Sequence, residues 1–143
     1  MAKELYFQDI NVKDQMPLLV KDPVKHMQLV KYAGASGDFN PLHVDPEFGK
    51  TVGIGSQIAH GMLVMGFVGQ AITNWIPKKY IRKFSVRFVG MTIIDDVVTV
   101  TGKVKSKKQE GGNNLILCNV YARNKADELL ITGSFEASLP DKK

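Results

Sequence analysis

The chain contains 143 residues, 44% of them hydrophobic and 23% charged, which fits one soluble domain with a packed core. This composition excludes a disordered, a collagen-like and a disulfide-scaffold protein. Lys and Arg total 19 against 14 Asp and Glu, so the net charge of +5 attracts phosphates, nucleic acid and acidic small molecules without choosing among them. The single Cys118 forms no internal disulfide and the N-terminus lacks the apolar stretch of a signal peptide, so we expect a cytoplasmic protein.

Helical patterns dominate the first half of the chain. Asp22 followed by proline is typical of a helix start, and the glycines at 34 and 37 should end that helix. Asp45, again followed by proline, predicts a short second helix. A third helix is predicted from about residue 60 to residue 75, where apolar residues are interrupted by glycines and a few polar side chains. These interruptions are unsuitable for a membrane span, so we predict a buried helix and no transmembrane segment.

From about residue 77 onwards the hydrophobic period changes to two, which is typical of half-buried strands. Phe84, Val86 and Phe88 share one face of a first strand. Turn residues at 110–113 and 124–127 then separate three more strands, predicted at 96–109, 114–123 and 128–139. We therefore expect an α+β fold in which an antiparallel sheet curls around the long apolar helix and buries it on most sides.

One loop in the first half of the chain holds the best candidates for chemistry. Asp38 and His43 lie five residues apart, with Pro41 between them and Gly37 just before them. Pro41 forces Asn40 out of the helical conformation and Gly37 frees the backbone, so the loop can turn both side chains toward one point. An Asp and a His that converge on one water form a pair suited to moving protons. From spacing alone, a helix-capping Asp and a surface His explain the pattern equally well.

The sequence SGDFNPLH at residues 36–43, followed by IAHGML at residues 58–63, closely resembles the signature of the MaoC-like dehydratases and (R)-specific enoyl-CoA hydratases, the hydratase 2 group of hotdog-fold proteins. The segment at 32–43 also resembles the catalytic subunit of (3R)-hydroxyacyl-carrier-protein dehydratases. With the strand-rich tail, the resemblance covers nearly the whole chain and implies a single hotdog domain over residues 1–143. It also implies that Asp38 and His43 are the catalytic pair.

The activity implied by this resemblance is the addition of water to trans-2-enoyl thioesters of CoA or acyl carrier protein, or its removal from (3R)-3-hydroxyacyl thioesters. Such chemistry needs a base for water, an acid for C2 and a donor for the enolate oxygen. The resemblance implies that the Gly61 N–H holds the thioester carbonyl, and that Asn40 and His60 are also substrate-binding residues. Capping or packing is the alternative role for His60, which precedes the helix. No cofactor is expected.

The sequence departs from the family pattern in two places. Relatives often carry a hydroxyl residue on the central helix to hold the catalytic Asp, whereas residues 64–69 here contain none. The usual Pro-Val-x-x-Gly-Asp turn is altered at residues 89–96, which are VGMTIIDD. The sequence therefore leaves open what supports Asp38 and how that turn is shaped.

Metal and nucleic-acid binding are less favoured by the sequence. Three scattered histidines and one cysteine lack the spacing of a zinc site, so no metal is expected. One basic cluster is a candidate to contact CoA phosphates or an acidic carrier protein, but a solvated surface explains it as well. Its members are Lys78, Lys79, Arg82, Lys83 and Arg87. Without stacking aromatics or a glycine-rich phosphate loop, nucleic-acid binding is not expected.

Two alternative functions share the hotdog fold. A hotdog thioesterase often carries a catalytic Asp or Glu on the central helix, but residues 60–75 contain neither. A non-catalytic or accessory subunit of a dehydratase complex has no need of Asp38 and His43, and both are present. We also expect a homodimer, because hotdog relatives pair the exposed sheet edges of two chains.

Overall fold

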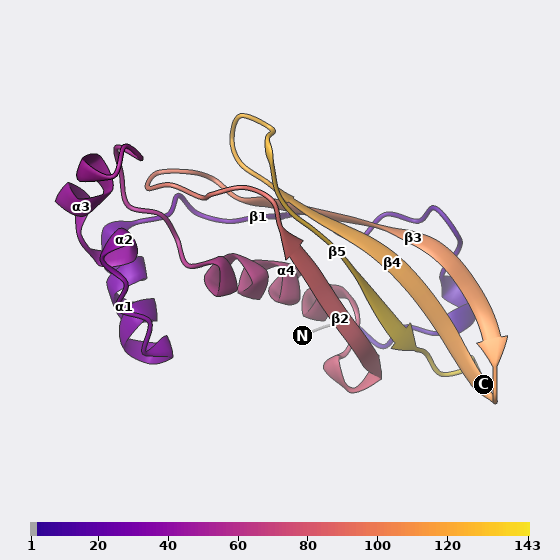
Figure 1. The fold of residues 1–143 in the computed structure, drawn as a ribbon. Helices are drawn as coiled ribbons and strands as arrows, with labels where there is room; N and C mark the ends of the chain where they lie inside the picture. Colours follow the sequence, from indigo (N-terminus) through magenta and orange to yellow (C-terminus); the bar gives the residue numbers. More distant parts are fainter. Residues whose placement is uncertain (1–2) are drawn as a thin grey trace.

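The computed structural model describes residues 3–143, which form one sheet and a set of helices around a hydrophobic core (Figure 1). The helices are α1 (His26–Ser36), α2 (Pro41–Val44), α3 (Pro46–Thr51) and α4 (Gly61–Trp75), with short 3-10 turns η1 (Phe7–Asp9) and η2 (Lys78–Tyr80). The strands are β1 (Leu19–Val20), β2 (Ile81–Phe88), β3 (Thr99–Glu110), β4 (Asn113–Arg123) and β5 (Leu129–Ser138). The predicted succession of helices and then strands is confirmed, but two short elements were not predicted: the two-residue β1, and α2, which lies in the segment expected to be a loop.

All five strands join in one antiparallel sheet with the order β1-β3-β4-β5-β2. β3, β4 and β5 form the predicted meander. Gly111 and Gly112 join β3 to β4 with φ angles of 57° and 79°, the left-handed values that a tight hairpin turn needs. In the next turn the Asn124 side-chain oxygen accepts hydrogen bonds from the N–H groups of Ala126 and Glu128, at 3.0 and 2.9 Å. These two turns fix the register of the meander.

Helix α4 lies along the concave face of the curved sheet (Figure 1). One face of the helix packs into the core together with sheet residues. The buried residues of this face are Val64, Phe67, Val68, Ala71 and Ile72. The opposite face, which includes Met62, Gly66 and Gln70, is exposed. The expectation that the sheet buries the helix on most sides is therefore wrong, because the curved sheet covers only one side of it. Among residues 3–143, no helix combines the length and the hydropathy needed to cross a membrane.

Helices α1, α2 and α3 lie together beside the N-terminal end of α4 (Figure 1). The predicted start of α1 at Asp22 and the following proline is wrong. Val24 is fully buried and its N–H donates to the Asp96 carbonyl at 2.9 Å, which holds the chain against a neighbouring loop before α1 begins. The end of α1 is as predicted, because Gly37 takes a φ of 76° directly after the helix. Asp45 caps α3, also as predicted.

Candidate active site

The loop between α1 and α2 places Asp38 opposite His43. Gly37 leaves α1 in the left-handed conformation, which turns the chain away from the helix axis. Asn40 is extended, with φ −53° and ψ 129°, as expected before a proline. Its side-chain oxygen accepts a hydrogen bond from the Leu42 N–H at 3.0 Å. Asn40 therefore caps α2, the short helix that carries His43.

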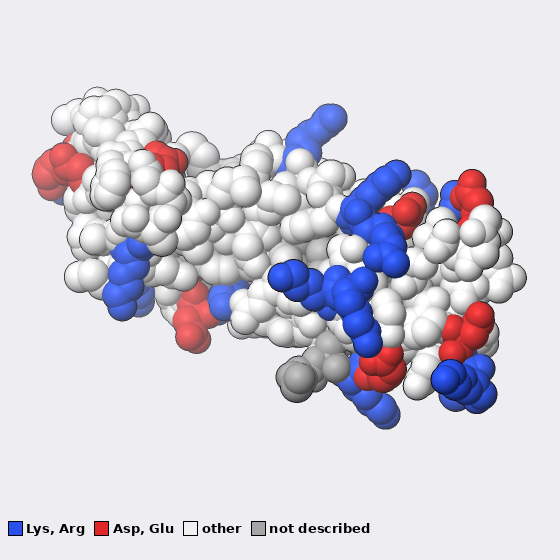
Figure 2. Space-filling model, turned by 90° about the horizontal axis from the view of Figure 1, so that it is seen from below, with Lys and Arg blue, Asp and Glu red and all other residues white. Residues whose placement is uncertain are grey.

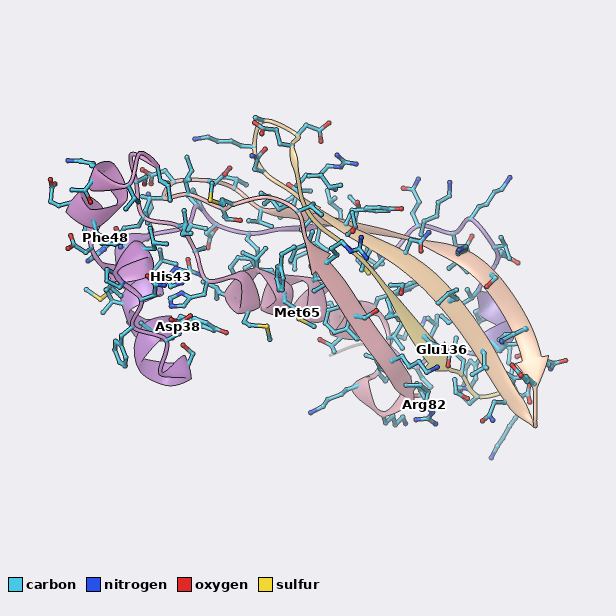
Figure 3. The ribbon with its side chains drawn as sticks, viewed as in Figure 1. Asp38, His43, Phe48, Met65, Arg82 and Glu136 are labelled. Carbon is cyan, nitrogen blue, oxygen red and sulfur yellow. The ribbon has the colours of Figure 1, made fainter. Side chains whose placement is uncertain are left out.

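Asp38 and His43 point toward each other at the end of the molecule that holds α1–α3 (Figure 3). His43 Nε2 is 3.6 Å from Asp38 Oδ2, too far for a direct hydrogen bond and close enough for both atoms to bind one water. The Asp38 side chain is 53% exposed and that of His43 is 11% exposed. Asp38 Oδ1 accepts a hydrogen bond from the Asn40 N–H at 3.3 Å. Residues 64–69 of the central helix offer no hydroxyl to hold this carboxylate. The contact that the structure shows comes from the backbone of the loop instead.

The surroundings of His43 determine which ring nitrogen faces Asp38. His43 Nδ1 lies 2.7 Å from the carbonyl oxygen of Ile58, and a carbonyl can only accept, so Nδ1 carries the hydrogen of this bond. Nε2 then holds a lone pair in the neutral ring and a proton in the charged ring. Gln57 donates from its side-chain nitrogen to the His43 carbonyl at 2.6 Å and so holds the same residue by its backbone. His43 is thus oriented to exchange a proton at Nε2.

Gly61 begins α4 beside this pair. The first N–H groups of a helix have no partners within the helix, and the side chain of the N-cap residue, His60, makes no capping hydrogen bond to α4. The helix dipole adds a positive potential at the same place. Gly61 lines a cavity of about 160 Å³ together with His43, and a second cavity of about 340 Å³ together with Asp38. A ligand beside the pair would therefore meet the N-terminus of α4.

Phe88, the last residue of β2, lies over Gly61. A Cβ atom built on Gly61 would lie 3.2 Å from Phe88 Cε1 and 3.3 Å from Phe88 Cδ1. The Phe88 ring also lines both cavities. Strand alternation predicted the face of Phe88 but not this contact, because the contact joins β2 to α4.

His60, the residue before α4, is buried, with 2% of its surface exposed. Its ring stacks on that of His43, with centroids 3.8 Å apart and planes 24° from parallel. Tyr32 meets the His60 ring in an edge-on contact at 4.7 Å. His60 Nε2 lies 3.0 Å from the backbone carbonyl oxygen of Asp38. Between the roles that the sequence left open, His60 packs and makes no side-chain cap, while its contact with a substrate stays a prediction.

Four of the five predicted site residues therefore come together: Asp38, His43, His60 and Gly61. The fifth, Asn40, directs its side-chain oxygen to the N-terminus of α2, so its contact with a substrate also stays a prediction. The site also includes contacts that the sequence did not predict. Tyr32 contacts His60, Gln57 donates to the His43 carbonyl and Phe88 lies over Gly61. Each of these contacts joins two residues that are far apart in the chain, so no local pattern indicates it.

Asp38, His43 and His60 also form a group of metal-binding residue types, with one ligand atom from each within 4.8 Å of one another. The lone pairs of an imidazole lie in its ring plane, so two stacked rings do not direct theirs at one ion. In addition, His43 Nδ1 and His60 Nε2 are each bonded to a backbone carbonyl. The geometry of the group fits proton transfer better than the tetrahedral coordination of a zinc ion.

One family model and several known sequences match most of this chain. The family model described as MaoC like domain matches residues 9–124. The (R)-specific enoyl-CoA hydratase of Rhodospirillum rubrum is 33% identical over 110 residues, which are 72% of this chain and 74% of that protein. The fatty acid synthase subunit beta of Gibberella zeae is 31% identical over 79% of this chain. The chain spans only 6% of the length of that subunit and of its counterpart in Saccharomyces cerevisiae.

Solved structures share the fold. An unliganded R-hydratase from Pseudomonas aeruginosa superposes with a TM-score of 0.86 at 22% identity, over 99% of this chain and 89% of that one. An (R)-hydratase from A. caviae superposes with a TM-score of 0.83 at 25% identity, over 93% of this chain and 99% of that one. The expected hotdog fold, a curled antiparallel sheet with a central helix, is thereby confirmed. Because the family model covers most of the chain and a hydratase relative is 33% identical over 72% of it, the chain belongs to the MaoC-like domain family.

Proposed function

We propose that this protein adds water to trans-2-enoyl thioesters, or removes it from the corresponding (3R)-3-hydroxyacyl thioesters. The observation that carries the proposal is the 3.6 Å separation of His43 Nε2 and Asp38 Oδ2 beside the uncapped N-terminus of α4. The pair supplies proton transfer and the helix N-terminus supplies charge stabilisation. The names of relatives in the family, enoyl-CoA hydratase and 3-hydroxybutyryl-CoA dehydratase, support the same reaction class.

In the proposed hydration step, one water lies between the two side chains. Its oxygen forms a bond to C3 of the substrate while one member of the pair takes a proton from it. The electron pair of the C2–C3 double bond moves toward the thioester carbonyl, and the other member of the pair gives a proton to C2. Dehydration is the reverse sequence. Because the Asp38 side chain is 53% exposed, the pair can recover its starting protonation state by exchange with solvent.

The charge that develops on the thioester oxygen needs a donor that is in place before the reaction. We assign this role to the Gly61 N–H, because it is the first N–H of α4 and lies beside both cavities. The dipole of the 15-residue helix favours negative charge at the same point. The thioester carbonyl would therefore lie at the N-terminus of α4, with C2 and C3 toward Asp38 and His43.

The smaller cavity is the proposed place for the acyl chain. It has a volume of about 160 Å³ and a mostly apolar lining that includes Val64, Met91, Leu130 and Ile131. Apolar side chains around an aliphatic chain gain free energy by removing it from water. His43 lines the same cavity, so a chain that enters there brings its first carbons to the catalytic pair.

We further propose that the acyl group is carried by coenzyme A. The (R)-specific enoyl-CoA hydratases of Rhodospirillum rubrum and Aeromonas caviae match over 74% and 84% of their own length, whereas the fatty acid synthase subunits match over 6% of theirs. The basic cluster predicted from the sequence lies on η2 and β2. Figure 2 shows Lys and Arg side chains gathered away from the end that holds α1–α3, and Figure 3 places Arg82 far from Asp38. Phosphate groups bound at Lys78 and Lys79, just after α4, would be separated from Gly61 by roughly the 22 Å length of this helix, whereas Arg87 is next to Phe88, the residue that lies over Gly61.

A homodimer is proposed as the working unit. Among residues 3–143, β2 pairs only with β5, so one side of β2 is an unpaired sheet edge in the described part of the chain. Phe88 and Val89 at the end of this strand are 48% and 49% exposed, and Met91 is 59% exposed. Pairing with a second copy would satisfy the edge and cover these apolar side chains. Light scattering that finds only a monomer of the 15.8 kDa chain in an active preparation would contradict this proposal.

The reaction is tested by incubating the purified protein with crotonyl-CoA and longer 2-enoyl-CoAs. Hydration removes the enoyl absorbance and produces a 3-hydroxyacyl-CoA without releasing free thiol. Thioester hydrolysis, the competing activity, releases free CoA and leaves the double bond intact. Detection of the thiol alone would support the hydrolase and refute the hydratase.

A further inference from the structure

We propose that His60 is a positioning residue that holds Asp38 and His43 in their reactive arrangement. The proposal rests on the proposed hydratase function, because it assigns His60 a role in that same reaction. His60 touches both members of the pair, but not through their reactive atoms. It contacts His43 through the ring face and Asp38 through the backbone carbonyl.

His60 holds the Asp38 loop through one hydrogen bond. A carbonyl oxygen only accepts hydrogen bonds, so His60 Nε2 carries the hydrogen and donates it to Asp38. Within residues 3–143, this is the one hydrogen bond that joins residues 37–40 to a segment outside α1 and α2. The other hydrogen bonds of this loop are local, and those made by its side chains are exposed, including the Asp38 N–H to the Ser36 hydroxyl at 3.2 Å. Without the His60 donor, the exposed loop would lose its attachment to the start of α4.

The other ring nitrogen of His60, Nδ1, shows why an imidazole rather than a plain aromatic ring occupies this position. Nδ1 is buried and has no hydrogen-bond partner among the described residues. A buried acceptor without a partner costs free energy, and a phenylalanine of similar shape would avoid that cost. Ring packing alone therefore does not explain an imidazole at this position. The donation from Nε2 to Asp38 does, because phenylalanine cannot make it.

The His43 ring is held by two contacts of different kinds. Its Nδ1 is bonded to the Ile58 carbonyl, and the His60 ring covers one of its faces at a centroid distance of 3.8 Å. A hydrogen bond along the ring edge and a stack on the ring face together limit both rotation in the ring plane and tilting out of it. The direction of Nε2 toward Asp38 is fixed as a result. Small errors in such a direction reduce proton transfer strongly.

Three substitutions separate the two contacts. His60→Phe keeps a ring to stack on His43 and removes the donor to Asp38. His60→Gln keeps an amide donor and removes most of the stack, and His60→Ala removes both. We expect His60→Phe to lower kcat about 10-fold or more with KM changed less than about 3-fold, His60→Gln to recover part of this loss, and His60→Ala to lose most activity. Val68→Ala, a buried truncation on α4 outside both cavities, controls for lost stability.

A measurement that needs no substrate accompanies the kinetics. Nitrogen-15 NMR reports which ring nitrogen of His43 carries the hydrogen. We expect the Nδ1–H form in the wild-type protein and in His60→Phe, and a mixture of forms in His60→Ala. Wild-type kcat in a folded His60→Phe protein, or an unchanged His43 tautomer in His60→Ala, would overturn the proposal. If the wild-type protein hydrates no enoyl thioester, the proposed function fails, and the NMR result alone decides the role of His60.

Discussion

Substitution of Gly61 tests whether the N-terminus of α4 meets the reacting thioester. In Gly61→Ala the new Cβ lies 3.2 Å from Phe88 Cε1, whereas carbon atoms prefer a separation of about 3.5 to 4.0 Å. The ring must then move by a few tenths of an ångström. In Gly61→Val the methyl groups extend about 1.5 Å beyond Cβ, so the displacement reaches roughly 1 Å. Because a misplacement of about 1 Å costs roughly 10²-fold, we expect kcat to fall about 10-fold in Gly61→Ala and about 10²-fold in Gly61→Val.

The stability of these variants should change much less than their turnover. Phe88 lies outside the hydrophobic core, so a shift of its ring should change the free energy of unfolding of the chain by less than about 1 kcal/mol. Gly34→Ala is the matched control, because a Cβ there meets no atom within 4 Å and the residue lies in α1. We expect this control to keep its kcat and to gain about 0.5 to 1 kcal/mol of stability. Kinetics with crotonyl-CoA and thermal denaturation measure both quantities. A Gly61→Val protein whose folded fraction turns over at the wild-type rate would refute the reasoning and make Gly61 a packing residue.

Three further predictions concern the catalytic pair, a strained turn and the buried thiol. Asp38→Asn and His43→Ala should each lower kcat about 10²-fold or more without changing the circular dichroism spectrum, and near-normal turnover would remove the residue from the mechanism. Asp95 has a φ of 65°, a left-handed conformation that glycine adopts more easily, so Asp95→Gly should raise the melting temperature by about 2 to 4 °C. A melting temperature below that of the wild-type protein would mean that the 2.6 Å ion pair between Asp95 and Lys25 outweighs the strain. Burial raises the pKa of Cys118 to about 12 from 9.0, so the unfolded chain releases this proton at lower pH than the folded one. Stability should therefore fall as the pH rises from about 9 toward 12, and a thiol reagent should label Cys118 only in denaturant; rapid labelling of the native protein would contradict this.

Local sequence signals predicted the elements that depend on local chemistry. Gly37 at the end of α1, Asp45 at the start of α3 and the paired glycines 111 and 112 in a turn each belong to the few residue types that favour such positions, and these positions were predicted correctly. The start of α1 was not, because Val24 is held by a hydrogen bond to Asp96, which lies far along the chain. The sequence around Asp22 favours a helix start, but it contains no information on the hydrogen bond to the distant Asp96, so the pattern alone could not predict the later start of α1.

In the candidate site, too, the residues of a local motif were predicted and the contacts between distant segments were not. Asp38 and His43 lie five residues apart, in the loop before α2 and in α2 itself, and the resemblance to a known motif was enough to name them. Their support was not predictable, because the Asn40 N–H and the His60 ring act through geometry rather than through spacing. The altered turn at 89–96 is explained only by the structure, where Asp95 takes a left-handed conformation that favours glycine.

The central claim is that Asp38 and His43 add water to an enoyl thioester held at the N-terminus of α4. The most direct test follows the absorbance of crotonyl-CoA in the presence of the wild-type protein and determines the configuration of the product. The proposed function predicts loss of the enoyl absorbance, formation of (3R)-3-hydroxybutyryl-CoA, and loss of this activity in Asp38→Asn. An unchanged absorbance, or a product that is exclusively (3S), would contradict it.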